Sequence, residues 1–277
     1  MLALRSLVHE ALLEDIGQGD ITTNLTVPED ARCRAHLFAK QDGVLSGIGV
    51  FRAVFEGLDA DMTDWKASPD GTRFTKGVEV ASFEANTRSV LTGERVALNF
   101  VQRLCGVATL TSKYVEAVAG LNTRICDTRK TTPFMRHLEK KAVQHGGGTN
   151  HRFALFDGVL IKENHIVAAG GVRQAVEKAS YGTHHLMKVG VEVTTLDELR
   201  EALDAGAGAI LLDNMTLEQI RDSVEIAQGT HVVLEASGNM SLERVRAIAE
   251  TGVHIISIGA LTHSAPAVDL SLEIENV

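Results

Sequence analysis

Apolar and polar positions are arranged in different ways along the chain, and each arrangement predicts a different kind of structure. The N-terminal stretch MLALRSLVHEALLED carries apolar residues at helical spacing, and a glycine-rich turn at residues 17–20 ends the predicted helix. From about residue 31 to residue 87 the sequence is strand-like, as in RCRAHLFAK and GVEVASFEA, with glycine-rich turns between the strands. A long helix with an apolar stripe follows over roughly residues 89–119. The first part of the chain therefore predicts a domain of mixed helices and strands.

After residue 122, short apolar runs alternate with amphipathic helices, as in HLMKVGVEV followed by LDELREALDAG. The runs end in polar residues at a nearly constant period: Glu192, Asp213, Glu235 and Ser257, at spacings of 21, 22 and 22 residues. A constant strand–helix period predicts parallel strands with helical crossovers. Polar residues at the carboxyl ends of such strands gather at the active-site mouth of a barrel, although acids there are also common caps of the following helix. We therefore predict an α/β protein in which a smaller N-terminal α+β domain precedes a C-terminal domain of barrel type.

The charge of the chain narrows the range of partners. The 277 residues carry a formal net charge of −9, and 23% of them are charged. Nucleic-acid and membrane-surface binding both need a broad basic face, so the sequence predicts neither kind of partner. The cations are instead concentrated in residues 126–152, CDTRKTTPFMRHLEKKAVQHGGGTNHR, where six Lys or Arg residues and three His accompany only two acids. A local cluster of this kind predicts a small anionic ligand.

The first part of this cluster is predicted to be a loop that leads into a helix. TRICDTR has the pattern of a strand that ends at Asp127, and Thr131 or Thr132 is expected to cap the following helix. Arg129 and Lys130 then lie in the loop before the helix N-terminus. Free N–H groups and the helix dipole favour an anion there, so two cations at this point indicate a phosphate or carboxylate site. A solvated basic face is the usual meaning of a charge run, and that interpretation suits the residues on the helix itself.

Further candidate residues follow this helix. Gly146 is expected to end it, and the three consecutive glycines also let the backbone approach a ligand closely. His151 and Arg152 stand at the entry to the next apolar run, and Lys162 stands at its end. Buried cations without partners are costly, so these side chains together imply an anionic ligand.

The sequence near the C-terminus has the pattern of a phosphate cradle. Gly259, in SIGALTHS, lies between a predicted strand and a short helix, where barrels commonly bind a phosphate, and Ser237-Gly238-Asn239 is the expected neighbouring loop. Small residues before a helix are also ordinary turn chemistry. Strand-end acids among anion-binding groups indicate a divalent metal, ribose hydroxyls or a developing positive charge.

The cysteines and the N-terminus bear on the cellular compartment. Cys33, Cys105 and Cys126 have no spacing typical of a disulfide framework or a zinc site, which predicts reduced thiols. The N-terminal helix acquires acids early, unlike a signal peptide, and no later apolar run reaches membrane-spanning length. We therefore expect a cytoplasmic protein.

Several motifs taken together resemble the quinolinate phosphoribosyltransferase family, the carboxylating nicotinate-nucleotide pyrophosphorylases of NAD biosynthesis. They occur in the family's order from about residue 14 to 264: EDIGQGDIT, GERVALNFVQRLCGVAT, DTRKTTPFMRHLEKKAVQHGGGTNHR, LIKENH, VEV, LDNM, LEASGN and SIGALTHS. The DTRKTTP…GGGTNHR block is highly specific, and the others are moderately so. One departure is His254, where the family usually has Asp. It stands at the start of a predicted strand, away from the mouth, where we expect little effect on chemistry.

The resemblance implies a fold, an assembly and a reaction. It implies an N-terminal α+β open-sandwich domain over residues 1–110, with or without the final residues 265–277, and an incomplete α/β barrel over residues 111–277. It implies a homodimer in which each barrel mouth is covered by the N-terminal domain of the other subunit. The implied reaction joins quinolinate to phosphoribosyl pyrophosphate with Mg²⁺, giving nicotinate mononucleotide, pyrophosphate and CO₂.

The resemblance also implies roles for individual residues. The quinolinate carboxylates would be held by Arg129, His151, Arg152 and Lys162, with Arg95 reaching in from the other subunit. Phosphoribosyl pyrophosphate and its metal would be handled by Lys130, Glu192 and Asp213, the two acids being the metal ligands. The 5′-phosphate would be held by Ser237, Gly238 and Gly259, and the substrate-binding residues would also include Thr128, Asn239, Ile258 and Ala260.

Two other functions are compatible with parts of this pattern. One is a related phosphoribosyltransferase that acts on another pyridine carboxylate, and the other is a non-catalytic phosphate-binding barrel. The complete DTRKTTP…GGGTNHR block argues against the first, and the intact set of charged groups argues against the second.

Overall fold

The computed structural model describes residues 2–277, which form two compact units. The first unit comprises the residues up to Ser112 together with Thr132–Gly147 and Ala265–Val277, and the second comprises Lys113–Thr131 and Gly148–Ser264. The helix within Thr132–Gly147, which the sequence analysis assigned to the C-terminal domain, is therefore grouped with the first unit. None of the helices in the described part of the chain is long and apolar enough to cross a membrane.

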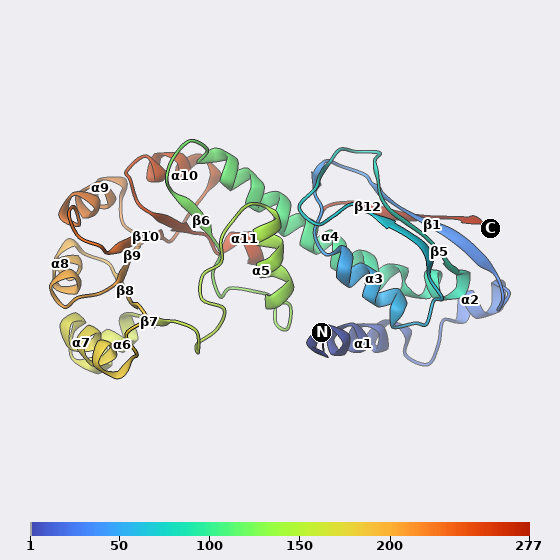
Figure 1. Ribbon diagram of the computed structural model, residues 1–277, viewed down its shortest axis with the longest axis horizontal. Coiled ribbons are helices and arrows are strands. Elements are labelled where there is room, and N and C mark those ends of the chain that lie inside the picture. The colour runs from blue at the N-terminus through green and yellow to red at the C-terminus, as the bar shows by residue number, and fades with distance from the viewer. Residues whose placement is uncertain (1) are drawn as a thin grey trace. The chain divides into compact units, whose positions relative to one another are not determined.

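The first unit is built on a four-stranded antiparallel sheet in the order β12-β1-β5-β3 (Figure 1). Its strands are β1 (Arg32–Ala39), β3 (Thr63–Ala67), β5 (Glu79–Asn86) and β12 (Leu270–Asn276). A separate two-stranded sheet pairs β2 (Gly43–Val44) with β4 (Arg73–Phe74). The helices are α1 (Leu2–Ile16), α2 (Ile21–Thr26), α3 (Ile48–Glu56), α5 (Arg136–His145) and most of α4 (Thr87–Ala117). The predicted N-terminal helix, long helix and strand segments RCRAHLFAK and GVEVASFEA are thus confirmed.

The sheet of the first unit has one polar and one apolar face. In β1, burial alternates residue by residue, because Ala35 and Leu37 point into the core while Arg34 and His36 point outward. Arg34 forms ion pairs with Asp64 and Glu84 on the outer face. This alternation is the pattern of a half-buried antiparallel strand.

Helix α3 lies within residues 31–87, which the sequence pattern predicts to be strand-like, so that prediction is wrong for Ile48–Glu56. IGVFRAVFE is a helix because its large side chains recur at helical spacing, and Val50, Phe51, Val54 and Phe55 are all buried. The ring of Phe55 lies 5.0 Å from that of Phe83 on β5, centroid to centroid. Packing of aromatic side chains against the sheet therefore outweighs the β propensity of the individual Val and Phe residues.

The end of the chain completes the first unit. Strand β12 pairs with β1 from Ala39–Leu270 to Cys33–Asn276, and the preceding segment packs against α4. There the N–H of Val268 donates to the carbonyl of Gln102 at 3.0 Å. A Cβ on Gly106 would lie 2.1 Å from the carbonyl oxygen of Pro266, so only glycine permits this approach.

The second unit is an incomplete α/β barrel. Its six strands are parallel, in the order β6-β11-β10-β9-β8-β7, and among the described residues no ladder joins the edge strands β6 and β7. The strands are β6 (Arg124–Cys126), β7 (Val159–Ile161), β8 (Val189–Val193), β9 (Ala209–Asp213), β10 (Val233–Ser237) and β11 (Ile255–Ser257). The helices are α6 (Glu163–Ala169), α7 (Val172–Gly182), α8 (Leu196–Asp204), α9 (Leu217–Ile226), α10 (Leu242–Ala249) and α11 (Ala260–His263). Figure 1 shows α8, α9 and α10 on the outer side of the strands.

The register of these strands arranges their polar residues in two layers. Glu192 on β8 pairs with Leu211 on β9, and Leu211 pairs with Glu235 on β10. Asp213 pairs with Ser237, two residues further toward the carboxyl ends. Side chains two residues apart on a strand share one face, so Asp213 and Ser237 lie one layer closer to the mouth than Glu235.

Helix α5 begins later than the sequence predicts. Neither Thr131 nor Thr132 caps it, because the helix starts at Arg136 and Met135 is its N-cap residue. Thr132 is instead bound by Glu139 from within the helix, and this carboxylate accepts the Thr132 N–H at 2.9 Å and its hydroxyl at 2.8 Å. The predicted end of the helix at Gly146 is confirmed. Five residues lie between Lys130 and the first residue of the helix, so the predicted role of the helix N-terminus in anion binding is not supported.

The delayed start of α5 is accompanied by backbone strain at Phe134. This residue has φ 63°, in the left-handed region, and it is 93% exposed. The left-handed conformation costs a side chain with a Cβ about 1–2 kcal/mol, whereas glycine adopts it freely but loses more entropy on folding.

A Phe134→Gly variant is therefore expected to be more stable than a Phe134→Ala variant by about 1 kcal/mol in free energy of unfolding. Alanine is the matched control because it keeps the strained backbone, and an exposed ring leaves little packing to lose. Denaturant unfolding of the two variants measures the difference. Equal stability of the two variants would contradict the assignment of strain.

Candidate active site

The carboxyl ends of the second unit's strands surround a cavity of about 820 Å³. Of the fifteen residues predicted for the site, fourteen line it: Thr128, Arg129, Lys130, His151, Arg152, Lys162, Glu192, Asp213, Ser237, Gly238, Asn239, Ile258, Gly259 and Ala260. The fifteenth, Arg95, lies on α4 in the first unit, and its side chain is exposed. Residues that are far apart in the sequence are thus brought together around one cavity.

The strand-end acids Glu192 and Asp213 do not cap the helices that follow them. Their alternative interpretation as helix caps is therefore wrong. Thr195 caps α8, and its hydroxyl accepts the N–H of Glu198 at 3.2 Å. Thr216 caps α9 in the same way, through the N–H of Gln219. Glu192 and Asp213 are therefore available for the cavity.

Glu192 and Lys162 form an ion pair inside the site. Lys162 directly follows β7, and Glu192 lies on the neighbouring strand β8. Lys162 Nζ donates to Glu192 Oε2 at 2.7 Å. The two charges neutralise each other, so the cavity wall here carries little net charge before a ligand binds.

Glu235 is the most deeply buried acid of the cavity. It is 5% exposed, and its Oε1 has no hydrogen-bond partner among the described residues. Burial raises the pKa of Glu235 from 4.5 to about 7, the hydrogen bond from Ser257 opposes this effect, and the negative charge of Glu192 adds to it. Glu235 belongs to the regular series of polar residues that end the apolar runs, but the sequence pattern predicts no individual role for it.

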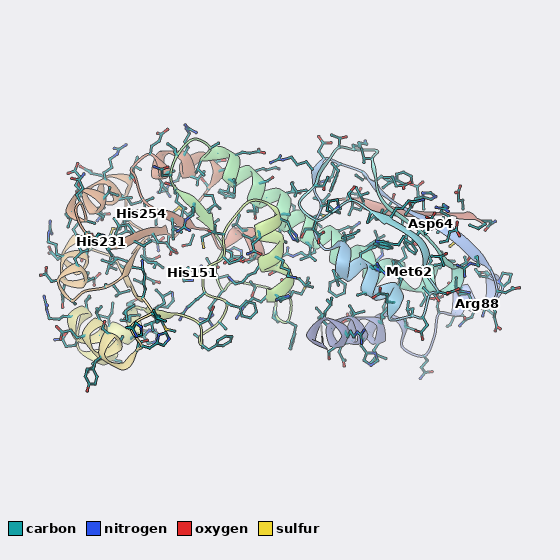
Figure 2. The ribbon with its side chains drawn as sticks, viewed as in Figure 1. Met62, Asp64, Arg88, His151, His231 and His254 are labelled. Carbon is teal, nitrogen blue, oxygen red and sulfur yellow. The ribbon has the colours of Figure 1, made fainter. Side chains whose placement is uncertain are left out.

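His151 is held in place by one hydrogen bond of its backbone and one of its ring. Its backbone N–H donates to Asp127 Oδ1 at 2.8 Å, and its ring Nδ1 accepts the N–H of Arg152 at 2.8 Å. The neutral imidazole therefore carries its proton on Nε2, which lies 3.6 Å from Glu235 Oε2. Figure 2 labels this histidine in the second unit.

Arg152 and Arg129 bring two guanidinium groups to the cavity. Arg152 Nη1 donates to the carbonyl of Gly158 at 2.8 Å, while its buried Nε lacks a partner among the described residues. Burial lowers the pKa of Arg152, and the positive charge of Arg129 lowers it further. Two cations that repel each other in a partly desolvated cavity favour an anion between them.

Lys130 approaches the backbone of Gly259 closely. A Cβ on Gly259 would lie 2.9 Å from Lys130 Cδ, so a larger residue would displace the lysine. The Lys130 N–H donates to Thr128 Oγ1 at 3.0 Å, and its carbonyl accepts the Thr262 hydroxyl at 2.7 Å. The lysine, the predicted phosphate glycine and the start of α11 thus form one packed group.

Several residues of the cavity were missed by the sequence analysis as site residues: Leu160, Leu211, Asn214, Glu235, Met240, Ser257 and His263. Asn214 follows Asp213 directly, so its position after a strand-end acid was the available signal. For the apolar residues no sequence signal separates a cavity wall from an ordinary core.

His254, which is labelled in Figure 2, has a structural role in the second unit. Its Nδ1 accepts the N–H of Leu234 at 3.0 Å, at the amino end of β11. An acceptor at this position therefore joins β10 to β11, at the opposite end of the strands from the cavity.

The raised pKa of Glu235 predicts a pH-dependent stability. Between pH 4.5 and about 7 the folded protein retains a proton that the unfolded chain has released, so the stability falls as the pH rises through this window. A shift of this size corresponds to at most about 3 kcal/mol. The titratable groups that face Glu235 are His151, whose Nε2 lies 3.6 Å from Glu235 Oε2, and Glu192 and Lys162, whose charges act on it.

A Glu235→Gln variant lacks this titrating group. Its free energy of unfolding, taken relative to that of the wild type, is therefore expected to be higher at pH 8 than at pH 5. Denaturant unfolding without ligands at both pH values measures the change, and other titrating groups cancel because both proteins contain them. The same difference in stability at both pH values would contradict a raised pKa.

The fold and the cavity define an α/β-barrel enzyme for anionic substrates, with cations, acids and glycine-rich loops at the barrel mouth. Residues 20–105 match the domain described as Quinolinate phosphoribosyl transferase, N-terminal domain, and residues 107–273 match the corresponding C-terminal domain. The chain belongs to the quinolinate phosphoribosyl transferase family.

Individual relatives agree with this assignment. A probable carboxylating nicotinate-nucleotide pyrophosphorylase of Bacillus subtilis is 40% identical over 273 residues, which cover 99% of this chain and 94% of the relative. The solved nicotinate-nucleotide pyrophosphorylase of Francisella tularensis is 42% identical, with a TM-score of 0.93 and coverage of 99% of this chain and 96% of that chain. NadC from Streptococcus pyogenes has the same TM-score of 0.93 at 40% identity, with coverage of 98% and 96%.

Proposed function

We propose that the protein transfers the phosphoribosyl group of phosphoribosyl pyrophosphate to quinolinate with loss of CO₂, in NAD biosynthesis. The products are nicotinate mononucleotide, pyrophosphate and CO₂. The observation that carries this proposal is that the cations Arg129, Arg152 and Lys162 share one cavity with Glu192 and Asp213, in a chain of this family. Relatives named for this reaction cover nearly the whole chain, which supports it further. A cytoplasmic location is part of the proposal.

Quinolinate is a dianion, and the cationic side of the cavity fits two carboxylates. Arg129 and Arg152 offer planar guanidinium groups, which match carboxylates in a bidentate geometry. Lys162 is neutralised by Glu192 in the absence of ligand, so it becomes a ligand for quinolinate when this ion pair opens. His151, with its proton on Nε2, lies beside this group.

The acids of the cavity suit the first chemical step. The pyridine nitrogen attacks C1 of the ribose while the bond from C1 to the pyrophosphate oxygen breaks, so positive charge develops on the ribose. Glu192 and Asp213 lie on neighbouring strands and stabilise this charge electrostatically.

The cations suit the second step. Once the ring nitrogen is alkylated, the bond from the ring to the adjacent carboxylate breaks, CO₂ leaves, and the electron pair remains on the ring carbon until a proton joins it. This negative charge lies beside a positively charged ring, and nearby Arg side chains stabilise it further.

Mg²⁺ is part of the proposal. Among the described residues no group of three or more His, Cys, Asp or Glu is arranged to hold a metal by itself. Glu192 and Asp213 fit the other common mode, in which Mg²⁺ is held by one or two carboxylates together with substrate phosphates. The ion would neutralise charge on the pyrophosphate.

A direct assay tests the proposed function. Protein, Mg²⁺, quinolinate and phosphoribosyl pyrophosphate are combined, and release of CO₂ and formation of the mononucleotide are measured. The expected result is that both products form in equal amounts. Binding of both substrates without turnover would instead indicate a non-catalytic barrel.

The proposed assembly is a homodimer in which Arg95 acts in the active site of the other subunit. Arg95→Ala and Lys130→Ala homodimers are each expected to be nearly inactive. In a mixed dimer one site keeps both groups and the other loses both, so random exchange of subunits should restore roughly a quarter of wild-type activity.

The control for this experiment is exchange between two differently tagged Arg95→Ala preparations, which should restore nothing. Formation of mixed dimers is verified by pull-down of both tags. If confirmed exchange of Arg95→Ala with Lys130→Ala leaves activity at background, Arg95 serves its own barrel or none.

A further inference from the structure

Asn214 occupies a junction at the mouth of the cavity. It is the first residue after β9, it lines the cavity, and its backbone is left-handed with φ 54°. Its N–H donates to the carbonyl of Ser237 on β10 at 3.0 Å. The residue therefore lies between a proposed metal ligand, Asp213, and the proposed phosphate loop at residues 237–239.

The amide nitrogen of the Asn214 side chain orients the carboxylate of the neighbouring Asp213. Its Nδ2 donates to Asp213 Oδ2 at 2.9 Å, and Asp213 is only half-buried. A partly exposed carboxylate would otherwise rotate, so the bond fixes its plane. With Oδ2 engaged, Oδ1 is the oxygen that remains for a ligand.

The other end of the side chain holds the phosphate loop. Asn214 Oδ1 accepts the side-chain N–H of Asn239 at 3.2 Å. It also lies so close to Gly238 that a Cβ there would be 2.2 Å from it, and Gly238 has φ 90°. Asn239 is left-handed as well, with φ 47°. The loop is thus closed onto the amide of Asn214.

Only an amide makes both bonds. The NH₂ group donates to the carboxylate and the oxygen accepts from Asn239, whereas an aspartate at this position would have no donor and would repel Asp213. Asparagine also tolerates the left-handed backbone better than most residues.

We propose that Asn214 is a positioning residue for phosphoribosyl pyrophosphate, which holds the Asp213 carboxylate and the 237–239 loop at a fixed separation. The inference rests on the proposed function, because it takes Asp213 to meet the ribose, the pyrophosphate or its metal and the loop to meet the 5′-phosphate. A ligand that spans both ends then finds its contacts already oriented. Quinolinate, bound by the cations, does not depend on this bridge.

Three variants test this inference. Asn214→Asp is isosteric and keeps a residue suited to the left-handed backbone, but it removes the donor. Asn214→Gly removes the side chain and relieves the strain, so a loss of function cannot be attributed to the backbone. Asn122→Asp makes the same change of charge at an exposed position two residues before β6, at the amino end of the strands. It is therefore the control for the added charge.

Equilibrium binding of phosphoribosyl pyrophosphate and of quinolinate is measured separately by calorimetry, with KM, kcat and melting temperature. We expect Asn214→Asp and Asn214→Gly to weaken phosphoribosyl pyrophosphate binding and raise its KM about 10- to 100-fold, as for loss of a hydrogen bond to a charged group. Quinolinate binding should change less than about twofold, Asn214→Gly should melt no lower than wild type, and Asn122→Asp should match wild type.

The inference is overturned if Asn214→Asp binds phosphoribosyl pyrophosphate like wild type, or if both substrates are weakened equally. It is also overturned if the loss merely follows a lowered melting temperature. Should the wild type bind phosphoribosyl pyrophosphate without converting quinolinate, the proposed function fails, while the binding data still decide the role of Asn214. A wild type that does not bind phosphoribosyl pyrophosphate overturns both.

Discussion

Asp213→Asn and Glu192→Gln variants should each lose about 10²–10³-fold in turnover, the usual effect of removing one electrostatic stabiliser. The reason is that both acids lie on adjacent strands of the cavity wall and carry the negative charge that a positively charged ribose needs. Quinolinate binding should be much less affected, and Glu192→Gln releases Lys162 from its ion pair without removing the cation.

Turnover is measured with both substrates saturating, and quinolinate affinity is measured by titration without phosphoribosyl pyrophosphate. Asp222→Asn is the matched control, because this acid is exposed on α9, outside the cavity. A large loss of quinolinate affinity with unchanged turnover at saturation would reverse the proposed roles of the acids.

The second large effect concerns the choice of substrate. Nicotinate lacks one of the two carboxylates of quinolinate, so it leaves part of the positive charge around Arg152 uncompensated in a site where water is partly excluded. We expect nicotinate to bind more weakly than quinolinate by about 2–5 kcal/mol, which is roughly 30- to 5,000-fold in Kd.

Calorimetric titration of the protein with each acid measures this difference. Isonicotinate, with one carboxylate at another ring position, is the control for the number of charges and should bind as weakly as nicotinate. Similar affinities for quinolinate and nicotinate would indicate a phosphoribosyltransferase with a different substrate.

The barrel and most of the cavity could be predicted from the sequence because their signals are local and repeated. Each repeat of 21 or 22 residues contains one strand and one helix. The repeat therefore predicts Glu192, Asp213 and Ser257 at strand ends. Capping by Thr195 and Thr216 is equally local, and it explains why the acids are left for the cavity.

The features that were missed depend on partners distant in sequence or on tertiary packing. Helix α3 forms because its aromatic side chains pack on Phe83. The start of α5 is displaced because Glu139, within the helix, binds Thr132 and also accepts from Arg103 on α4. The proposed role of Asn214 depends on the strand register, which brings the loop after β10 beside it.

The pairing of β1 with β12 also has a consequence for the order of folding. The two strands are separated in sequence by the whole second unit, yet they are neighbours in the sheet of the first unit. During synthesis β12 leaves the ribosome after residues 113–264, so until then β1 has an open edge, which is a template for wrong pairing. All strands of the second unit leave the ribosome before β12 does. The N-terminal sheet is therefore completed last, after translation of the barrel, and closing this long loop makes its assembly a candidate for the slow step of folding.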